Sequence, residues 1–243
     1  MKSQSYQCEG IVLRVTDYRD FDQIVTLYSK EFGKISAYAP SSRRSVKRFG
    51  GCFQAMAKLS FLASSPRSSE QSLWRLQQAE VKDLYFHHRE NLFSLATLVY
   101  FCECITAFLP EAQSDGVVYE WLENVLSSYP SEKKFDQMFQ FELELLSALG
   151  FRPGLFQCVE CLSEFKDKKR RFFSFEKGGV MCDSCVPRGE GKMIESSPSS
   201  MSMNLSRLDF INWVHTFHDF LSFNSQQSLK TQQFRKEIMY ASL

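Results

Sequence analysis

Four cysteines, arranged as two C-x-x-C pairs, are the residues of this chain best suited to chemistry. Twenty residues separate Cys158-Val-Glu-Cys161 from Cys182-Asp-Ser-Cys185, which is the spacing of a four-thiolate zinc site. The two-residue gap lets both sulfurs of one tight turn reach the same ion, and the intervening segment is long enough for a β-hairpin. Because all four ligands come from the protein, no coordination position stays open for water. The spacing therefore predicts one structural Zn²⁺ bound by Cys158, Cys161, Cys182 and Cys185.

Two other uses of cysteine pairs have to be weighed. A redox C-x-x-C normally occurs singly, beside a βαβ unit, whereas this chain has two matched pairs. Disulfides belong to oxidising compartments, but the residues Met1–Tyr6 lead into no apolar segment of a secretory signal. We therefore expect a cytoplasmic protein with reduced thiols. The other cysteines share no spacing and are predicted to be small buried apolar residues; they are Cys8, Cys52, Cys102 and Cys104.

A cluster of cations in the first third of the chain is the second candidate site. The segment Arg43-Arg44-Ser45-Val46-Lys47-Arg48 places four positive charges in six residues, in what is predicted to be a loop between strands. On a small barrel, such loops and one sheet face form the usual groove for single-stranded nucleic acid. The alternative is a solvated loop that contacts nothing specific. The candidate DNA-binding residues are Arg14, Lys30, Lys34, Arg43, Arg44, Lys47 and Arg48.

Aromatic residues and a second basic run lie near these cations in the sequence. Tyr28, Tyr38 and Phe49 can stack on bases, although packing in the core is the more common role of such residues. The run Lys166–Arg171 lies between the cysteine pairs. It either adds to a nucleic-acid surface or flanks an exposed hairpin.

Composition favours a soluble globular protein with an uneven charge distribution. The chain has 243 residues and a hydrophobic content of 44%, which is ample for a core. No apolar run reaches the length of a membrane span. The overall charge of +1 hides an excess of five positive charges in residues 1–80 and of seven negative charges in residues 81–151. This asymmetry indicates an anion-binding face on a nearly neutral molecule.

The residue pattern changes along the chain from runs rich in β-branched and aromatic residues to apolar residues at helical spacing. Five short strands followed by turn residues predict a small barrel or half-open sheet. The later apolar stripes, separated by Pro110, Pro130 and Gly150, predict a helical bundle. Strands are expected at 11–15, 24–28, 35–38, 53–61 and 73–76, a hairpin between the cysteine pairs at 172–181, and helices at 92–109, 117–126, 135–149 and 208–221, with a linker at 196–204.

The ordered set of these segments resembles the RecO family of bacterial DNA recombination and repair proteins. The resemblance extends from about Glu9 to Cys185. It rests on Gly10–Arg14, Thr26–Ala37, Phe139–Leu146 and Leu149–Pro153, the last of which runs directly into the cysteine pairs. One departure falls at Pro40-Ser41-Ser42, where the family usually has a Lys-Gly step before its basic loop.

The resemblance implies an α+β fold and a non-enzymatic function in DNA repair. It implies an N-terminal OB-fold barrel that binds DNA (residues 1–80), a helical domain (81–157 and 186–243) and a zinc-ribbon-like insert (158–185). Such proteins bind single- and double-stranded DNA and anneal complementary strands. With RecR they help to load the RecA recombinase onto DNA coated with single-strand-binding protein, whose C-terminal tail they contact. The expected location is the cytoplasm, at the nucleoid when the protein is active.

Competing functions find less support in the residues. His88-Arg89-Glu90 is an H-x-E, as in zinc deaminases, but it lies far from the cysteines, Gln157 rather than proline precedes the first pair, and the second pair would have no role. Neither a phosphate-binding G-x-x-x-x-G-K-[ST] nor a G-x-S-x-G elbow occurs. We expect no small-molecule substrate and no membrane partner. An RNA-binding module or a non-catalytic protein scaffold stays open as an alternative.

Overall fold

The computed structural model forms two compact units, Met1–Tyr129 and Pro130–Leu243. The first unit contains the barrel and also two long helices that the sequence analysis assigned to a separate helical domain. The predicted domain bounds stay a prediction, because a compact unit need not be an independently folding domain. The residues that the structure describes are 4–66, 73–130, 134–165, 170–187, 191–194, 205–224 and 229–242. The predicted linker at 196–204 and most of the basic run 166–171 lie outside them.

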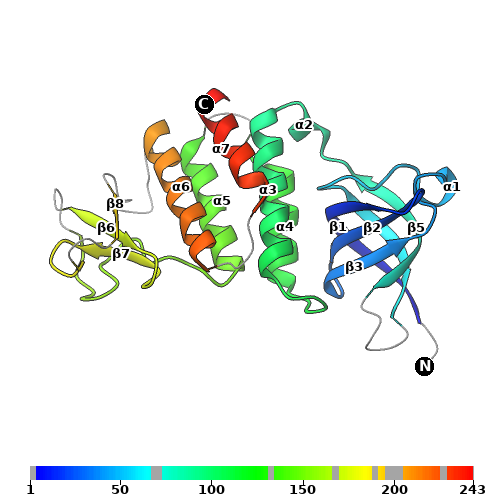
Figure 1. Ribbon diagram of the computed structural model, residues 1–243, viewed down its shortest axis with the longest axis horizontal. Helices are drawn as coiled ribbons and strands as arrows, with labels where there is room; N and C mark the ends of the chain where they lie inside the picture. The colour runs from blue at the N-terminus through cyan, green and yellow to red at the C-terminus, as the bar shows by residue number, and fades with distance from the viewer. Residues whose placement is uncertain are drawn as a thin grey trace. The chain divides into compact units, whose positions relative to one another are not determined.

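Five strands of the first unit close into a barrel (Figure 1). Their order around the barrel is β1-β2-β3-β5-β4, with β4 pairing back to β1. All neighbours are antiparallel except β3 and β5, which pair in parallel. This is the OB-fold barrel that was predicted. The strands are β1 (Ser5–Tyr18), β2 (Asp22–Ser29), β3 (Gly33–Ala39), β4 (Lys58–Ser64) and β5 (Trp74–Asp83).

The barrel interior is built by alternation along each strand. Val25, Ala37 and Trp74 occupy neighbouring positions on β2, β3 and β5 and are all buried in one apolar cluster. Because successive side chains of a strand point to opposite faces, residues on either side of these three point outward. The alternation therefore decides which residues of the N-terminal third reach solvent.

The fourth strand begins later than the sequence predicted. The expectation was residues 53–61, whereas β4 starts at Lys58. Met56 has φ of 72°, and the backbone of Met56 and Ala57 bonds to Val12 instead of continuing the strand ladder. Phe53 is still packed against the barrel core, so the apolar residues were identified correctly and their backbone conformation was not.

Two capped helices follow the barrel in the first unit. The side chain of Asn91 accepts from the Ser94 N–H at the start of α3 (Leu92–Phe108), and that of Asp115 accepts from the Val117 N–H at the start of α4 (Gly116–Ser128). The short helices α1 (Val46–Phe49) and α2 (Phe86–Arg89) lie earlier in the chain. In the described part of the chain, no helix is both long enough and apolar enough to cross a membrane.

The β2–β3 turn packs against the segment between α3 and α4. Ala112 N–H donates to the Lys34 carbonyl over 2.8 Å, and Ser36 Oγ donates to Glu111 over 2.7 Å. Gly33 has φ of 68°, and a Cβ at this position would collide with the backbone of Gln113. The turn needs glycine both for its left-handed conformation and for this close approach.

Gly33→Ala is therefore expected to destabilise the first unit by about 2–4 kcal/mol, from the left-handed backbone and the steric overlap together. Denaturant unfolding of the purified variant measures this. The control is Gly116→Ala, since a Cβ there meets nothing within 4 Å; it should change stability by less than about 1 kcal/mol. Equal stability of the two variants would contradict the proposed packing.

The described residues of the second unit form three helices and a small sheet. The order of the sheet is β7-β6-β8, and its hairpin agrees with the strand–turn–strand expected between the cysteine pairs. Helices were predicted at 135–149 and 208–221, and both are present. The elements are α5 (Phe135–Ala148), β6 (Arg171–Ser174), β7 (Gly179–Cys182), β8 (Lys192–Ile194), α6 (Arg207–Asn224) and α7 (Thr231–Ser242).

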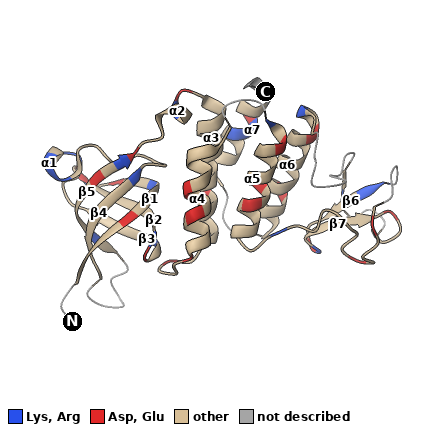
Figure 2. Cartoon of the chain, turned by 180° about the vertical axis from the view of Figure 1, so that it is seen from behind, with Lys and Arg blue, Asp and Glu red and all other residues tan. Residues whose placement is uncertain are grey.

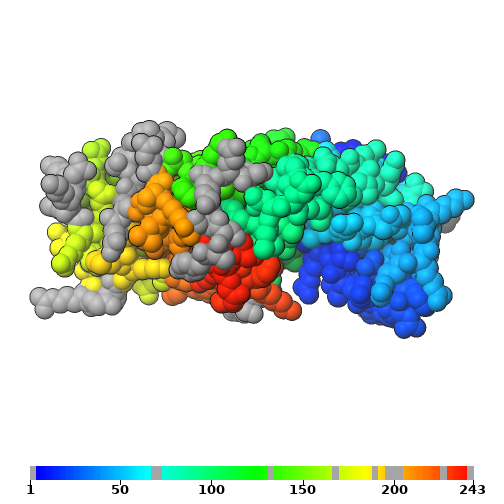
Figure 3. Space-filling model, turned by 90° about the horizontal axis from the view of Figure 1, so that it is seen from above, coloured from blue at the N-terminus to red at the C-terminus, as the bar shows by residue number. Residues whose placement is uncertain are grey.

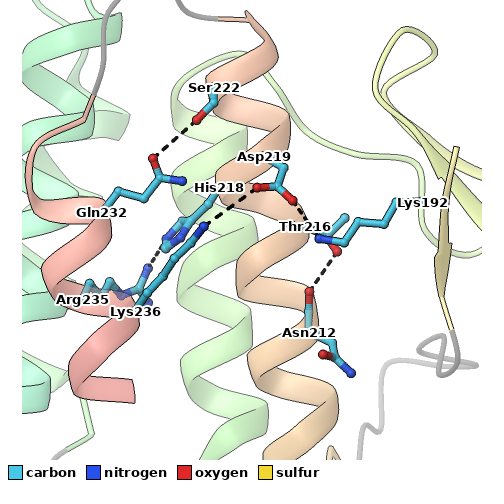
Figure 4. Close-up of polar contacts among 9 residues, drawn as sticks. All are labelled: Lys192, Asn212, Thr216, His218, Asp219, Ser222, Gln232, Arg235 and Lys236. Carbon is cyan, nitrogen blue, oxygen red and sulfur yellow. Dashed lines mark hydrogen bonds and ion pairs between the residues drawn. The ribbon is translucent and has the colours of Figure 1, made fainter. Parts of the chain in front are cut away.

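Polar contacts attach α7 and β8 to α6 (Figure 4). Asp219 accepts from Lys192 on β8 over 2.8 Å and lies 3.9 Å from Lys236 on α7. Arg235 is fully buried, donates to Glu142 on α5, and lies 3.0 Å from His218 Nε2. Burial lowers the pKa of His218 well below its usual value, so the neutral ring can accept this hydrogen bond. Because an uncompensated buried charge is costly, these partners hold α7 in one position.

Candidate nucleic-acid interface and metal centre

One outward face of the barrel leads to residues 40–48, the basic loop, whose last three residues belong to the short helix α1 where the sequence predicted only a loop. The strand register places Thr16, Ile24, Tyr38 and Arg75 side by side across β1, β2, β3 and β5. All four point away from the core by alternation. Arg14 lies two residues before Thr16 on β1 and is exposed. The face is therefore mixed, with polar, aromatic and cationic side chains.

The basic loop is anchored to the start of β2. Asp22 accepts from the Ser41 N–H over 2.7 Å, and the carbonyl of Phe21 accepts from the Arg43 N–H over 3.1 Å. Ser42 adds a side-chain hydrogen bond of 3.0 Å to Gln23. These contacts hold the loop beside the outward face.

Arg48 braces the loop from within. Its Nη2 donates to the Pro40 carbonyl over 2.8 Å and its Nε to Ser45 Oγ over 3.0 Å. The adjacent Phe49 is buried in the barrel core. Two of the Arg48 N–H groups are thus used to close the loop, although the sequence placed Arg48 with the other DNA-binding candidates.

Three cations of the loop remain exposed: Arg43, Arg44 and Lys47. Arg43 lies 3.6 Å from Asp17, with about half of its side chain exposed (51%). The guanidinium of Arg44 lies 3.1 Å from the centre of the Phe21 ring. Figure 2 shows Lys and Arg at the α1 end of the barrel and Asp and Glu on α4. Figure 3 shows the segment around α1 projecting from the barrel surface.

The remaining predicted cations have different environments. Lys30 is exposed at the β2–β3 turn. Lys34, in contrast, is buried, and its Nζ donates to the Thr106 carbonyl on α3 over 2.7 Å. Burial lowers the pKa of Lys34. We therefore leave Lys34 out of the interface and treat it as a contact between the barrel and α3.

The three aromatic candidates also have different environments. Tyr28 and Phe49 are buried in the first unit, so they follow the more common role that the sequence analysis assigned to such residues. Tyr38 is half-buried on the outward face, next to Arg75. The sequence analysis did not identify Arg75, although its position between the apolar Trp74 and Leu76 predicts that it points outward.

The four predicted metal ligands converge in the second unit. Their four sulfur atoms all lie within 4.8 Å of one another; the residues are Cys158, Cys161, Cys182 and Cys185. Cys158 is buried and Cys161 is exposed. The Cys182 N–H donates to the Cys158 sulfur over 3.4 Å. Among the described residues this is the group of thiols arranged to hold a metal ion.

The segment before the first cysteine packs tightly on β7. The Val180 N–H donates to the Gly154 carbonyl over 2.7 Å, and the Val159 N–H donates to the Val180 carbonyl over 3.0 Å. A Cβ on Gly179 would lie 2.5 Å from the Gly154 carbonyl oxygen. The absence of that side chain lets the two cysteine turns meet.

Hydrogen bonds shift the pKa values of Cys161 and Cys185 in opposite directions. Hydrogen bonding by Ser163 lowers the pKa of Cys161 to about 6. The sulfurs of Cys182 and Cys161 raise the pKa of Cys185 to about 12. Four thiolates this close require a bound cation to be ionised together. The donor set fits Zn²⁺, which tolerates four sulfurs in a tetrahedron, and a site with four protein ligands is typical of structural rather than catalytic zinc.

Comparison with known proteins gives matches over most of the chain. The family model described as "Recombination protein O N terminal" matches residues 1–85, and the one described as "Recombination protein O C terminal" matches residues 89–205. The boundary between the two matches follows the barrel, so the N-terminal model covers the outward face and the basic loop. The C-terminal model covers all four cysteines.

Curated relatives agree with the family models. A DNA repair protein RecO from Symbiobacterium thermophilum is 36% identical over 191 residues, which is 77% of this chain and 74% of that protein. The proteins of the same name from Pelobacter propionicus and Geobacter sulfurreducens are 32% and 31% identical, and each match covers 74% of this chain and 72% of the relative. These matches, together with the geometry of the barrel and of the four cysteines, show that the chain belongs to the RecO family.

Proposed function

We propose that this protein acts in DNA repair and recombination by binding DNA through the outward face and basic loop of its barrel. The observation that carries the proposal is the exposure of Arg43, Arg44 and Lys47 on one loop that is anchored beside that face. Cations that neutralise phosphates release bound counterions, which favours association with any polyanionic strand. The names of the relatives support DNA as the nucleic acid.

The proposed mechanism is non-enzymatic. Phosphate contacts reduce the repulsion between two strands, so complementary single strands held on the protein can pair and anneal. The second unit, which Zn²⁺ bound to the four cysteines would stabilise, provides surfaces for protein partners. By family resemblance these are RecR and the C-terminal tail of single-strand-binding protein. Together they would help to load RecA recombinase onto coated single strands.

The test is a fluorescence-anisotropy titration with labelled oligonucleotides of one sequence at several salt concentrations. Single-stranded DNA, double-stranded DNA and RNA are compared. We expect binding to both DNA forms, with an affinity that falls linearly as the logarithm of salt rises, by a slope of about 0.7 per phosphate contact for single strands and about 0.9 for duplex. If only RNA bound tightly, the proposed ligand would be RNA instead of DNA. No binding to any strand at low salt would leave a protein scaffold as the function.

Strand annealing is checked separately. Two complementary oligonucleotides, one with a fluorophore and one with a quencher, are mixed with and without the protein. Faster quenching with protein, suppressed at high salt, is expected. A protein that binds DNA but leaves the pairing rate unchanged would contradict the annealing step while preserving the binding proposal.

A further inference from the structure

Two tyrosines form an aromatic pair on the outward face of the barrel. Tyr18 lies at the end of β1 and Tyr38 near the end of β3. Their ring centres are 6.1 Å apart and the ring planes are perpendicular. The Tyr18 side chain is 41% exposed, and Tyr38 is half-buried. The pair therefore provides ring surface to solvent.

Each ring carries its own arginine. The guanidinium carbon of Arg19 lies 5.1 Å from the centre of the Tyr18 ring, and that of Arg75 lies 5.6 Å from the centre of the Tyr38 ring. Both arginines are exposed. Guanidinium groups are planar, so they can stack on a ring or on a base and also neutralise a phosphate.

The Tyr38 ring is fixed by the same carboxylate that anchors the basic loop. The Tyr38 hydroxyl donates to one oxygen of Asp22 over 2.6 Å, and the other oxygen accepts from the Ser41 N–H over 2.7 Å. Asp22 thus couples the orientation of the ring to the position of the loop. The neighbouring Asp17 is paired with Arg43 and with Gln23.

From this arrangement we infer that Tyr18, Tyr38, Arg19 and Arg75 form a stacking platform for the unpaired bases of a single strand. The inference rests on the proposed function and adds to it a preference for exposed bases. Arg43, Arg44 and Lys47 on the adjacent loop hold the phosphates, while the rings take the base faces. Bases in a duplex are stacked on one another and do not offer these faces, so the platform distinguishes single strands from duplex.

Charge complementarity decides for a nucleic acid over a protein as the occupant. The platform and the basic loop together present five exposed cations, of which Arg43 is paired with Asp17. Arg19 and Arg75 lie against aromatic rings that a base can reach. Base–aromatic stacking contributes about 1–3 kcal/mol per base and tolerates any sequence. An acidic peptide could pair with the cations, but it has no bases to stack on the rings. Binding that depends on bases therefore separates a nucleic acid from a peptide.

The test compares two 12-nucleotide strands with the same backbone charge. One carries bases, and the other carries abasic tetrahydrofuran sites in place of every base; both are fluorescently labelled and titrated with the full chain. The platform predicts that the strand with bases binds at least about 10-fold more tightly, with equal salt slopes. Equal affinity for the two strands would overturn the platform but not the phosphate contacts. If neither strand bound, the proposed function would fail as well.

Variants locate the effect within the face. Tyr18→Leu and Arg75→Ala should each reduce the preference for bases by about 5- to 10-fold, whereas Tyr18→Phe and Arg75→Lys distinguish ring stacking from lost charge. We expect Tyr18→Phe to restore the preference and Arg75→Lys to restore only the affinity for the abasic strand. Lys82→Ala, on the same strand as Arg75 but at its other end, serves as the control. An unchanged preference in Tyr18→Leu would assign the base contacts to other residues and overturn the inference.

Discussion

The double variant Cys158→Ser/Cys182→Ser is expected to contain no zinc and to lose the ordered structure of the β6–β7 hairpin. The double variant removes one ligand from each cysteine turn, so neither turn keeps its pair of thiolates. Four-cysteine sites supply much of the folding free energy of the small segments that contain them. The metal content, measured by mass spectrometry of the digested protein, should fall from one ion per chain to none.

Loss of the ion should spread into the helices of the second unit. Phe173 on β6 is fully buried, and its ring centre lies 5.4 Å from that of Phe220 and 6.3 Å from that of Trp213 on α6. An unfolded hairpin withdraws Phe173 from this cluster and exposes apolar surface on α6. We expect the second unit to lose at least about 3 kcal/mol of stability, which lowers its melting temperature by about 10–20 °C. Hydrogen exchange should show lower protection over residues 207–224.

The control for this prediction is Cys52→Ser, which makes the same chemical change at a buried cysteine outside the metal cluster. It should keep one zinc ion per chain, even if it costs some stability in the barrel. A double variant that is free of zinc yet melts at the temperature of the unchanged protein would contradict the structural role. Retention of zinc by the double variant would contradict the ligand assignment itself.

Local patterns were sufficient to predict much of this molecule. The cysteine spacing depends only on two tight turns and a hairpin, so the convergence of the four sulfurs followed from the chain alone. Runs of β-branched and aromatic residues predicted β2 and β3, and apolar spacing predicted α3, α4, α5 and α6. In each case the residues that form the element are also the residues that predict it, and they lie close together in the sequence.

Which individual cations are exposed to solvent could not be predicted in the same way. Lys34 and Arg48 look like Arg43 and Lys47 in the sequence, but their hydrogen bonds in the folded chain set them apart. Lys34 meets a carbonyl on α3, seventy-two residues later in the chain, and Arg48 closes its own loop onto Pro40. Which cation is available depends on the tertiary structure, and the net charge of a segment does not reveal it.

This distinction sharpens the test of the interface. Replacing Arg43, Arg44 and Lys47 with alanine removes three exposed charges while leaving the Arg48 brace intact. If each contacts one phosphate, the salt slope should fall by about 2 for single strands and by nearly 3 for duplex. The affinity at 0.1 M salt should then fall by about 100-fold for single strands and by about 500-fold for duplex, which anisotropy titrations measure directly.

A matched control separates local contacts from net charge. Lys82, Arg152 and Arg207 are exposed cations outside the basic loop, and replacing all three with alanine changes the total charge by the same amount. If attraction is only a matter of overall charge, the two triple variants should weaken DNA binding equally. If the loop holds the phosphates, the control should keep nearly the full salt slope, and the Arg48→Ala variant should lie between the two because it loosens the loop without removing the three exposed cations. Because the chain is almost neutral overall, a strong and local effect of three residues is the result that a positioned loop requires.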